Sequence, residues 1–256
     1  MKVTVCQLPD AQDAFLIQWQ KLCEHTAEQK SELVLLPEMP FSSWVSAERQ
    51  ADPDRWLSTV QEHEAWLLRL AELAPAIVFS TRPILEEGQP FNEGFGWDLQ
   101  HGILPVHRKY YLPEDEDFWE SSWYRRGDGS FEPVSWGSVR IGFMICSELW
   151  FFERARAYGK QGVQILLTPR ATARYSVDKW LTGGRAAAVV SGAYSLSSNK
   201  VSPPGTRPQF GGQGWIVDPD GVVLGLTTDE QPFLTVDLDI TAADAAKSTY
   251  PRYIQE

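Results

Sequence analysis

The sequence predicts an α/β protein with a layered core. Short β-branched or apolar runs recur along the chain, and helical patterns lie between several of them. Strands that alternate with helices are typical of an α/β sandwich. No linker or low-complexity segment divides the 256 residues, so we expect one domain over residues 1–256, near the upper size of a single core. The expected strands are residues 2–8, 33–37, 76–80, 139–145, 163–168, 214–218 and 233–239.

Residues 12–30 are expected to form the first helix. Phe15, Trp19, Leu22 and Cys23 fall on one face of this segment at helical spacing. This spacing is that of an amphipathic helix, which buries its apolar face against the neighbouring strands.

Two further helical patterns and two loops follow. Residues 62–73 and 178–190 have helical patterns, although the second contains Gly183 and Gly184, and glycine is a weak helix former. Clusters of Pro and Gly predict loops at residues 85–94 and 201–214.

Charge and composition exclude several classes of partner. The net charge is -11, whereas nucleic-acid binding and attraction to an anionic membrane both need a basic surface. No run approaches the roughly 18 apolar residues of a membrane-spanning helix, and Pro and Asp interrupt the N-terminal segment before a signal-peptide core. We therefore expect a cytoplasmic protein that binds neither nucleic acid nor membrane.

The histidine and cysteine spacings predict no metal site. Gly and Pro separate His101 from His107, and the three cysteines form no CxxC motif, which also argues against a disulfide framework. Cys6 lies in the first expected strand and Cys23 on the apolar helix face, where a free cysteine is usually core packing.

Cys146 instead ends an apolar strand and precedes a helical pattern. A helix N-terminus at that point favours a thiolate, although a buried packing cysteine fits the same position.

Two charged residues also follow apolar strands. Glu38 comes directly after "LVLLP" and Lys109 after "HGILPVHR". Taken singly, a glutamate or lysine in such a place is an ordinary surface charge.

The blocks "LLPEMPF", "HRKYYLPEDEDFWE" and "IGFMICSELWF" occur in this order, and together they resemble the three signature blocks of the nitrilase superfamily of carbon-nitrogen hydrolases. "KVTVCQLP", "FNEGFGWDLQHGILPVHRK" and "FGGQGWIVDPDGVVLG" extend the resemblance over nearly the whole chain.

This resemblance implies a role for four residues. Glu38 matches the general base of the family, Lys109 the lysine that stabilises the tetrahedral intermediate, and Cys146 the nucleophile. Glu120 matches the second glutamate found after the lysine in many members. Glu114, Glu116 and the intervening Asp residues compete with Glu120 for that role, although the run "EDED" is also typical of a solvated loop.

The resemblance further implies a four-layer αββα sandwich that assembles into homodimers or larger homo-oligomers. The expected reaction is hydrolysis of a small amide or carbamoyl compound through a thioester, with no metal or cofactor. Nitrile hydrolysis, acyl transfer to an amine, and a non-catalytic scaffold are the alternatives. The site would need a nucleophile, an oxyanion site that includes the backbone N–H of Ser147, and a proton for the departing amine.

Several residues are candidates for substrate binding. Ser147 stands where many family members have an aromatic residue, and the resemblance therefore implies that a bulky pocket wall is missing here. Arg170 follows the expected strand of residues 163–168, and the resemblance implies that the end of this strand borders the pocket. A guanidinium there would suit a substrate carboxylate or pair with an acidic neighbour. Trp44, Trp119 and Trp150 lie next to the signature residues and are candidates for pocket walls or for core packing.

Overall fold

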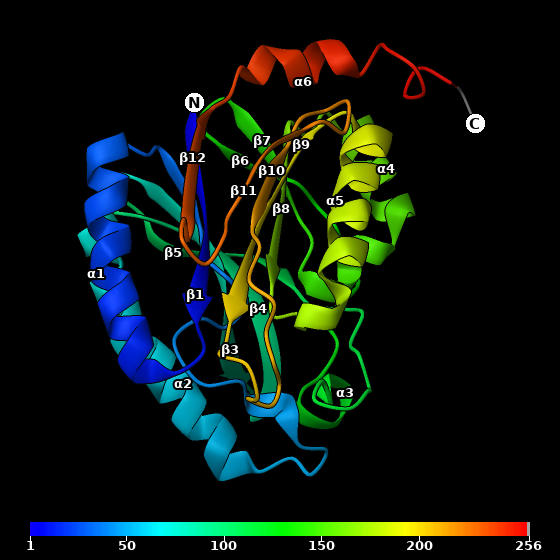
Figure 1. The fold of residues 1–256 in the computed structure, drawn as a ribbon. Helices are drawn as coiled ribbons and strands as arrows, with labels where there is room; N and C mark the ends of the chain where they lie inside the picture. The colour runs from blue at the N-terminus through cyan, green and yellow to red at the C-terminus, as the bar shows by residue number, and fades with distance from the viewer. Residues whose placement is uncertain (255–256) are drawn as a thin grey trace.

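The computed structural model describes residues 1–254, and it places the strands between two layers of helices (Figure 1). The strands are β1 (Lys2–Pro9), β2 (Leu33–Leu35), β3 (Ile77–Glu86), β4 (Gln89–Asp98), β5 (Gly102–Arg108), β6 (Val134–Trp136), β7 (Val139–Phe143), β8 (Ile165–Arg170), β9 (Tyr194–Val201), β10 (Trp215–Val217), β11 (Val223–Leu226) and β12 (Phe233–Asp237). The helices are α1 (Gln12–Gln29), α2 (Pro53–Leu67), α3 (Glu120–Trp123), α4 (Phe152–Lys160), α5 (Val177–Ser191) and α6 (Ile240–Ala246). Short 3₁₀ helices are η1 (Val45–Ala47), η2 (Leu68–Leu73), η3 (Cys146–Trp150) and η4 (Arg174–Ser176).

Strand β1 joins the two halves of the sheet. It pairs in parallel with β2 through its first residues and with β9 through its last, within the order β5-β4-β3-β2-β1-β9-β8-β7-β6. Strands β1, β2, β3, β7, β8 and β9 are linked by parallel pairings, and β4 is antiparallel to both β3 and β5. The carboxyl ends of β2, β5, β7 and β8 therefore lie at the same end of the sheet.

The two halves of the sheet pack face to face, and helices cover their outer faces. The Phe79 ring of β3 lies 6.3 Å from the Phe143 ring of β7 in the inner core. On one outer face, Phe15 and Trp19 of α1 pack with strand residues in a second core, and on the other side α4 and α5 cover β8 to β10 (Figure 1). These are the four layers, helix–sheet–sheet–helix, that the resemblance implied. Because both faces are covered, the six residues of β8 are all buried.

The predicted helices are confirmed with changes at their boundaries. Residues 12–30 and 178–190 correspond to α1 and α5. The pattern at residues 62–73 covers the end of α2 and the 3₁₀ helix η2. Helix α2 begins at Pro53 because Asp52 accepts hydrogen bonds from two N–H groups of the first turn. The prediction of a loop at residues 85–94 is wrong, because β3 and β4 continue through it into a hairpin with residues 87–88 as the turn.

The two cysteines expected in packing positions occupy them. Cys6 is fully buried in β1, and its Sγ donates to the Leu35 carbonyl oxygen at 3.4 Å. Cys23 is half-buried on α1, beside the core that α1 forms with the sheet. Within residues 1–254, no helix combines the length and the apolar composition that crossing a membrane requires.

The glycines of α5 allow a close approach to the sheet. A Cβ at Gly184 would lie 2.5 Å from the ring of Trp215, which is fully buried on β10. Gly183 has a looser environment, with its nearest neighbour at 3.1 Å on Trp150. The loss of helix propensity is therefore offset by the packing of α5 against β10.

We expect Gly184→Ala to lower the free energy of unfolding by about 1–2 kcal/mol. Overpacking of the core lowers the free energy of unfolding by about 1–3 kcal/mol. The higher helix propensity of Ala offsets up to about 1 kcal/mol of this loss. Urea denaturation measures the change. Thr182→Ala, on the exposed face of the same helix, is the control and should show no loss. A Gly184→Ala variant as stable as wild type would contradict the close packing.

Candidate active site

Four of the predicted site residues follow strands whose carboxyl ends meet. Glu38 comes three residues after β2, Lys109 directly after β5 and Cys146 three residues after β7, and Arg170 is the last residue of β8. Ligand sites of α/β sheets commonly form at the carboxyl ends of strands. The chain direction therefore gathers these residues at one end of the sandwich.

Lys109 is the centre of the cluster. Its Nζ lies 2.8 Å from Glu38 Oε1 and 2.5 Å from Glu120 Oε2, and all three side chains are buried. Tyr124, just after α3, donates a hydrogen bond to Glu120 Oε2. The competing carboxylates Glu114 and Glu116 are on the surface, so the structure brings Glu120 to the lysine, as the resemblance implied.

The electrostatics of the cluster follow from burial and charge. Burial alone would lower the pKa of Lys109, but the charges of Glu120 and Glu38 outweigh it and the pKa is raised. Burial raises the pKa of Glu120 to about 7, against the opposing effect of Lys109. A positive ammonium between two carboxyl groups leaves one negative charge in excess when both are ionised.

Asn92 fixes the orientation of Glu38. The Asn92 Nδ2 donates to Glu38 Oε1 at 2.8 Å, the same oxygen that Lys109 contacts, and the Lys109 backbone N–H donates to the Asn92 carbonyl at 3.0 Å. Among residues 1–254 the other oxygen, Glu38 Oε2, is buried without a hydrogen-bond partner. A buried acceptor without a partner is costly, which is typical of a functional atom. Sequence analysis missed Asn92, although an amide inside a buried strand is a signal for it.

Cys146 lies in a strained turn at the start of η3. Its φ is 48°, in the left-handed region that a non-glycine residue rarely adopts, and 4% of the residue is exposed. Burial raises the pKa of the thiol well above its usual value, and the charge of Glu38 raises it further despite the opposing effect of Lys109. The expectation of a thiolate at a helix N-terminus is therefore wrong, because the buried site and its carboxylate outweigh the five-residue η3.

Glu148 connects the Cys146 turn to the Lys109 loop, and sequence analysis missed it. One carboxylate oxygen accepts from the Ile145 N–H and the other from the Tyr110 N–H, both at 2.7 Å. His107 Nε2 lies 2.8 Å from the same carboxylate. A buried charge held by three donors is a rigid connection between the two loops.

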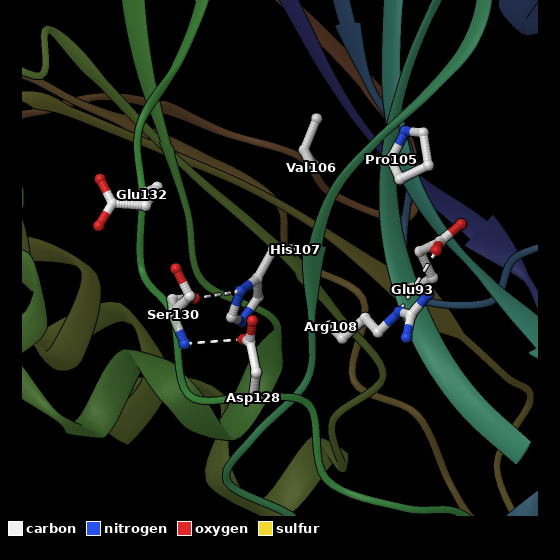
Figure 2. A pocket seen from close by; sticks show the side chains of 8 residues that line it. All are labelled: Glu93, Pro105, Val106, His107, Arg108, Asp128, Ser130 and Glu132. Carbon is white, nitrogen blue, oxygen red and sulfur yellow. Dashed lines mark hydrogen bonds and ion pairs between the residues drawn. The ribbon is translucent and has the colours of Figure 1, made fainter. Parts of the chain in front are cut away.

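The other ring nitrogen of His107 faces away from Glu148. Its Nδ1 lies 3.1 Å from the Ser130 carbonyl oxygen, at the wall of a separate cavity of about 260 Å³ (Figure 2). Figure 2 shows His107 reaching from β5 toward the segment with Asp128 and Ser130, with Arg108 turned toward Glu93. His107 is thus held from both sides, which fixes Glu148 in turn.

A small cavity opens beside Cys146. Its volume is about 150 Å³, below the about 300–1,000 Å³ that holds drug-sized ligands. Ser147 lines it, but its hydroxyl donates to the Tyr111 carbonyl oxygen at 2.5 Å. The remaining lining residues are Pro113, Asp115, Phe118, Glu120, Ala171, Thr172, Ala173, Tyr175, Ser176 and Trp180.

The structure places none of the three predicted tryptophans among the residues that line this cavity. Trp44 is buried in a separate aromatic cluster, and Trp119 is half-buried beneath Arg49. Trp150 is 41% exposed and packs with its ring centroid 5.0 Å from that of Trp180. Position beside a signature residue in the sequence did not determine which side chain faces the cavity.

Arg170 does not reach the cavity either. Its guanidinium is buried and donates to Ser197 Oγ and Thr172 Oγ1 at 2.7 Å and to the Gln213 carbonyl oxygen at 2.8 Å. It lies over the Trp215 ring at 4.1 Å. All three guanidinium nitrogens therefore have partners, and no carboxylate of residues 1–254 pairs with it, which contradicts both the substrate role and the expected acidic neighbour.

The sandwich, with a thiol, a lysine and carboxylates gathered at one end, defines the chain as a member of the nitrilase superfamily. Residues 2–248 match the model of the carbon-nitrogen hydrolase family. The chain belongs to this family. A carbon-nitrogen hydrolase from Helicobacter pylori G27 has the same fold, with a TM-score of 0.86 and 21% identity over 99% of this chain and 94% of its own.

Relatives include hydrolases of amides and carbamoyl compounds by name. An amidase from Nesterenkonia sp. AN1 is 25% identical with a TM-score of 0.76, over 95% of this chain and 92% of its own. Nitrilase homolog 2 of Dictyostelium discoideum is 28% identical over 66% of this chain and 53% of its own length. N-carbamoylputrescine amidase of Arabidopsis thaliana is 27% identical over 54% of this chain and 52% of its own. The chain thus spans about half the length of these two curated relatives.

We expect Glu120→Gln to change the pH dependence of stability. Because the pKa of Glu120 is raised from 4.5 to about 7, the folded chain binds this proton more tightly than the unfolded chain. The resulting stabilisation of the folded chain is fully present below pH 4.5, the pKa of Glu120 in the unfolded chain. It is lost as the pH rises through about 7, the pKa of Glu120 in the folded chain. Gln does not titrate, so the stability of wild type relative to the variant should fall by about 3 kcal/mol between about pH 5 and 8.

Urea denaturation across this pH range measures the difference. Glu64→Gln removes an exposed carboxylate on α2 and controls for the loss of a surface charge. If the free energies of unfolding of wild type and Glu120→Gln changed with pH in parallel, folding would not raise the pKa of Glu120.

Proposed function

We propose that this protein hydrolyses the C–N bond of a small amide or carbamoyl compound through a cysteine thioester. The observation that carries the proposal is the buried Lys109 held between Glu38 and Glu120, in electrostatic contact with Cys146. Cys146 and Glu120 line one cavity, and Glu120 is linked through Lys109 to Glu38. A thiol, a base and a cation are what attack on a carbonyl requires. A scaffold without catalysis has no need of this combination.

In the acylation step, Glu38 acts as the base. Oε2 takes the proton of the Cys146 thiol while Sγ forms a bond to the carbonyl carbon. The oxyanion is stabilised by Lys109 and by the backbone N–H of Ser147. An ammonium has three N–H donors, and Glu38 and Glu120 accept two of them, which leaves the third for the oxyanion.

In the second half of the reaction the C–N bond breaks and water replaces the amine. The tetrahedral intermediate collapses, Glu38 gives its proton to the leaving nitrogen, and a thioester remains on Cys146. A water then attacks the thioester carbonyl as Glu38 removes its proton. Cys146 leaves as the thiol and the acid is released, so that Glu38 is again a carboxylate.

The relatives and the cavity support this class of substrate. The Nesterenkonia amidase is described with the acetamide moiety of fluoroacetamide added covalently at its active-site cysteine. Further relatives are N-carbamoylputrescine amidase, which is named for a carbamoyl compound, and the citrullinase of Francisella tularensis, which is 25% identical over 67% of this chain. A cavity of about 150 Å³ suits a small aliphatic compound.

Cys146→Ala should abolish hydrolysis, with a loss of at least about 1,000-fold in kcat. The measurement is ammonia release from a panel of amides, carbamoyl amines and nitriles. Cys23→Ala removes a half-buried cysteine on α1 and should retain activity. Addition of hydroxylamine should divert the thioester to a hydroxamate at the expense of the acid. Equal turnover by wild type and Cys146→Ala would exclude the cysteine as nucleophile.

Asn92→Ala should lower kcat by roughly 10- to 100-fold with little change in KM. The variant removes a hydrogen bond to a charged acceptor, worth about 1.5–3 kcal/mol, and frees the Glu38 carboxylate to turn. Steady-state kinetics with the best substrate of the panel measure the two constants, and thermal unfolding confirms that the variant is folded. A change in KM alone would mean that Asn92 contacts substrate instead of positioning the base.

A further inference from the structure

The acidic loop before α3 borders the cavity of Cys146. Residues 114–117 carry four consecutive carboxylates, and Asp115 is the one that lines the cavity. Sequence analysis left this run as a solvated loop or as an alternative to Glu120. With Lys109 bound to Glu120, the loop has no part in the lysine cluster, and its charge is unaccounted for by the proposed reaction.

Arginines neutralise three of the four carboxylates. Glu114 Oε1 lies 3.4 Å from Arg49 Nε. The Arg207 guanidinium forms ion pairs with both Glu116 and Asp117, the latter at 2.8 Å. Asp115 alone of the four has no cationic partner within residues 1–254. The carboxylate at the cavity is therefore the one whose charge remains uncompensated.

The backbone around Asp115 holds this carboxylate in place. The Phe118 N–H donates to the Asp115 carbonyl oxygen at 2.8 Å, which closes a turn. Asp115 Oδ1 accepts from the Glu116 N–H at 2.8 Å, and the loop is held further by Trp44 Nε1, which donates to the Asp117 carbonyl at 3.0 Å. A charge fixed in advance binds a ligand at a lower entropic cost than a mobile one.

The charged groups of the cavity lining are all acidic. Asp115 and Glu120 are the charged residues of the lining, and Glu120 is paired with the buried Lys109. Arg170 is held by neutral acceptors and does not line the cavity. The aromatic rings of Phe118, Tyr175 and Trp180 form much of the remaining wall. Aromatic faces and a carboxylate attract a cation and disfavour a second anion.

We propose that Asp115 selects substrates that carry a positively charged group, so that the site takes a short aliphatic amide or carbamoyl amine with an ammonium at its far end. The inference rests on the proposed hydrolysis and names its substrate class. The ammonium pairs with Asp115 at the mouth while the carbonyl lies at Cys146. The small volume limits the chain between the two groups to a few carbons.

The test compares compounds of equal shape and different charge. 4-Aminobutanamide, pentanamide and glutaric acid monoamide share one chain and end in an ammonium, a methyl and a carboxylate, and 4-aminobutylurea and pentylurea form the matching carbamoyl pair. Wild type should give a kcat/KM at least tenfold higher for the cation than for the neutral compound, and lowest for the anion. Asp115→Asn should reduce the cation-to-neutral ratio by roughly 10- to 100-fold, the usual size of a charged hydrogen bond.

Glu116→Gln is the matched control, because it removes a neighbouring charge that faces Arg207 and not the cavity. Its cation-to-neutral ratio should equal that of wild type. An unchanged ratio in Asp115→Asn, or a wild-type preference for the neutral or anionic compound, would overturn the selection by Asp115. Added salt should lower the wild-type ratio, because a charge pair at the mouth is screened.

Calorimetric binding separates this inference from the proposed hydrolysis. Cys146→Ala should bind the cationic compound more tightly than the neutral one, and the double variant with Asp115→Asn should lose that difference. Selective binding without turnover by wild type would overturn the hydrolysis and retain the role of Asp115. Equal binding of cationic and neutral compounds by Cys146→Ala would overturn that role, whatever the turnover.

Discussion

The buried charge of Lys109 constrains the rest of this structure. An ammonium removed from water without partners costs many kcal/mol, and Lys109 is fully buried. Glu38 and Glu120 compensate it, and each arrives from a different part of the chain, after β2 and at the start of α3. The strands must therefore end in register at one edge before the lysine can be buried at all. Folding of the sandwich and assembly of the site are in this sense one event.

Burial and the carboxylates of this cluster act together on the thiol. Burial raises the pKa of Cys146, and the charge of Glu38 raises it further despite the opposing effect of Lys109. Asn92 and Lys109 both contact Glu38 Oε1, which leaves Oε2 without a hydrogen-bond partner among residues 1–254. Cys146 has a strained backbone, and Glu148 accepts a hydrogen bond from the N–H of the preceding residue, Ile145. Glu148 also accepts from the N–H of Tyr110, which directly follows Lys109. Cys146 and Lys109 are thus held by one rigid connection.

What the sequence predicted depended on local pattern and chain order. Apolar runs predicted most strands, whereas the resemblance to the family, and not the local pattern, singled out Glu38, Lys109 and Cys146. In the structure these residues come together because β2, β5 and β7 point the same way. Side-chain direction was not predictable, because it depends on packing between distant segments. Arg170 turns toward β9 and β10 instead of the cavity. The pairing of the acidic loop with Arg207 joins residues about 90 positions apart, and no local pattern contains it.

The contrast between two of the buried cations, Lys109 and Arg170, explains the charge of the cavity lining. Lys109 has two carboxylate partners, whereas Arg170 has only neutral acceptors and all three of its guanidinium nitrogens donate within the fold. Arg170 still contributes to the site through its backbone, because its carbonyl accepts from the Glu38 N–H at 3.2 Å and so fixes the backbone of Glu38. Burial lowers the pKa of Arg170, yet it remains a cation at neutral pH, and its charge is confined behind the sheet end. Asp115 is then the charged lining residue without an ion-pair partner among residues 1–254. A loop outside the lysine cluster therefore supplies the negative charge with which a substrate interacts.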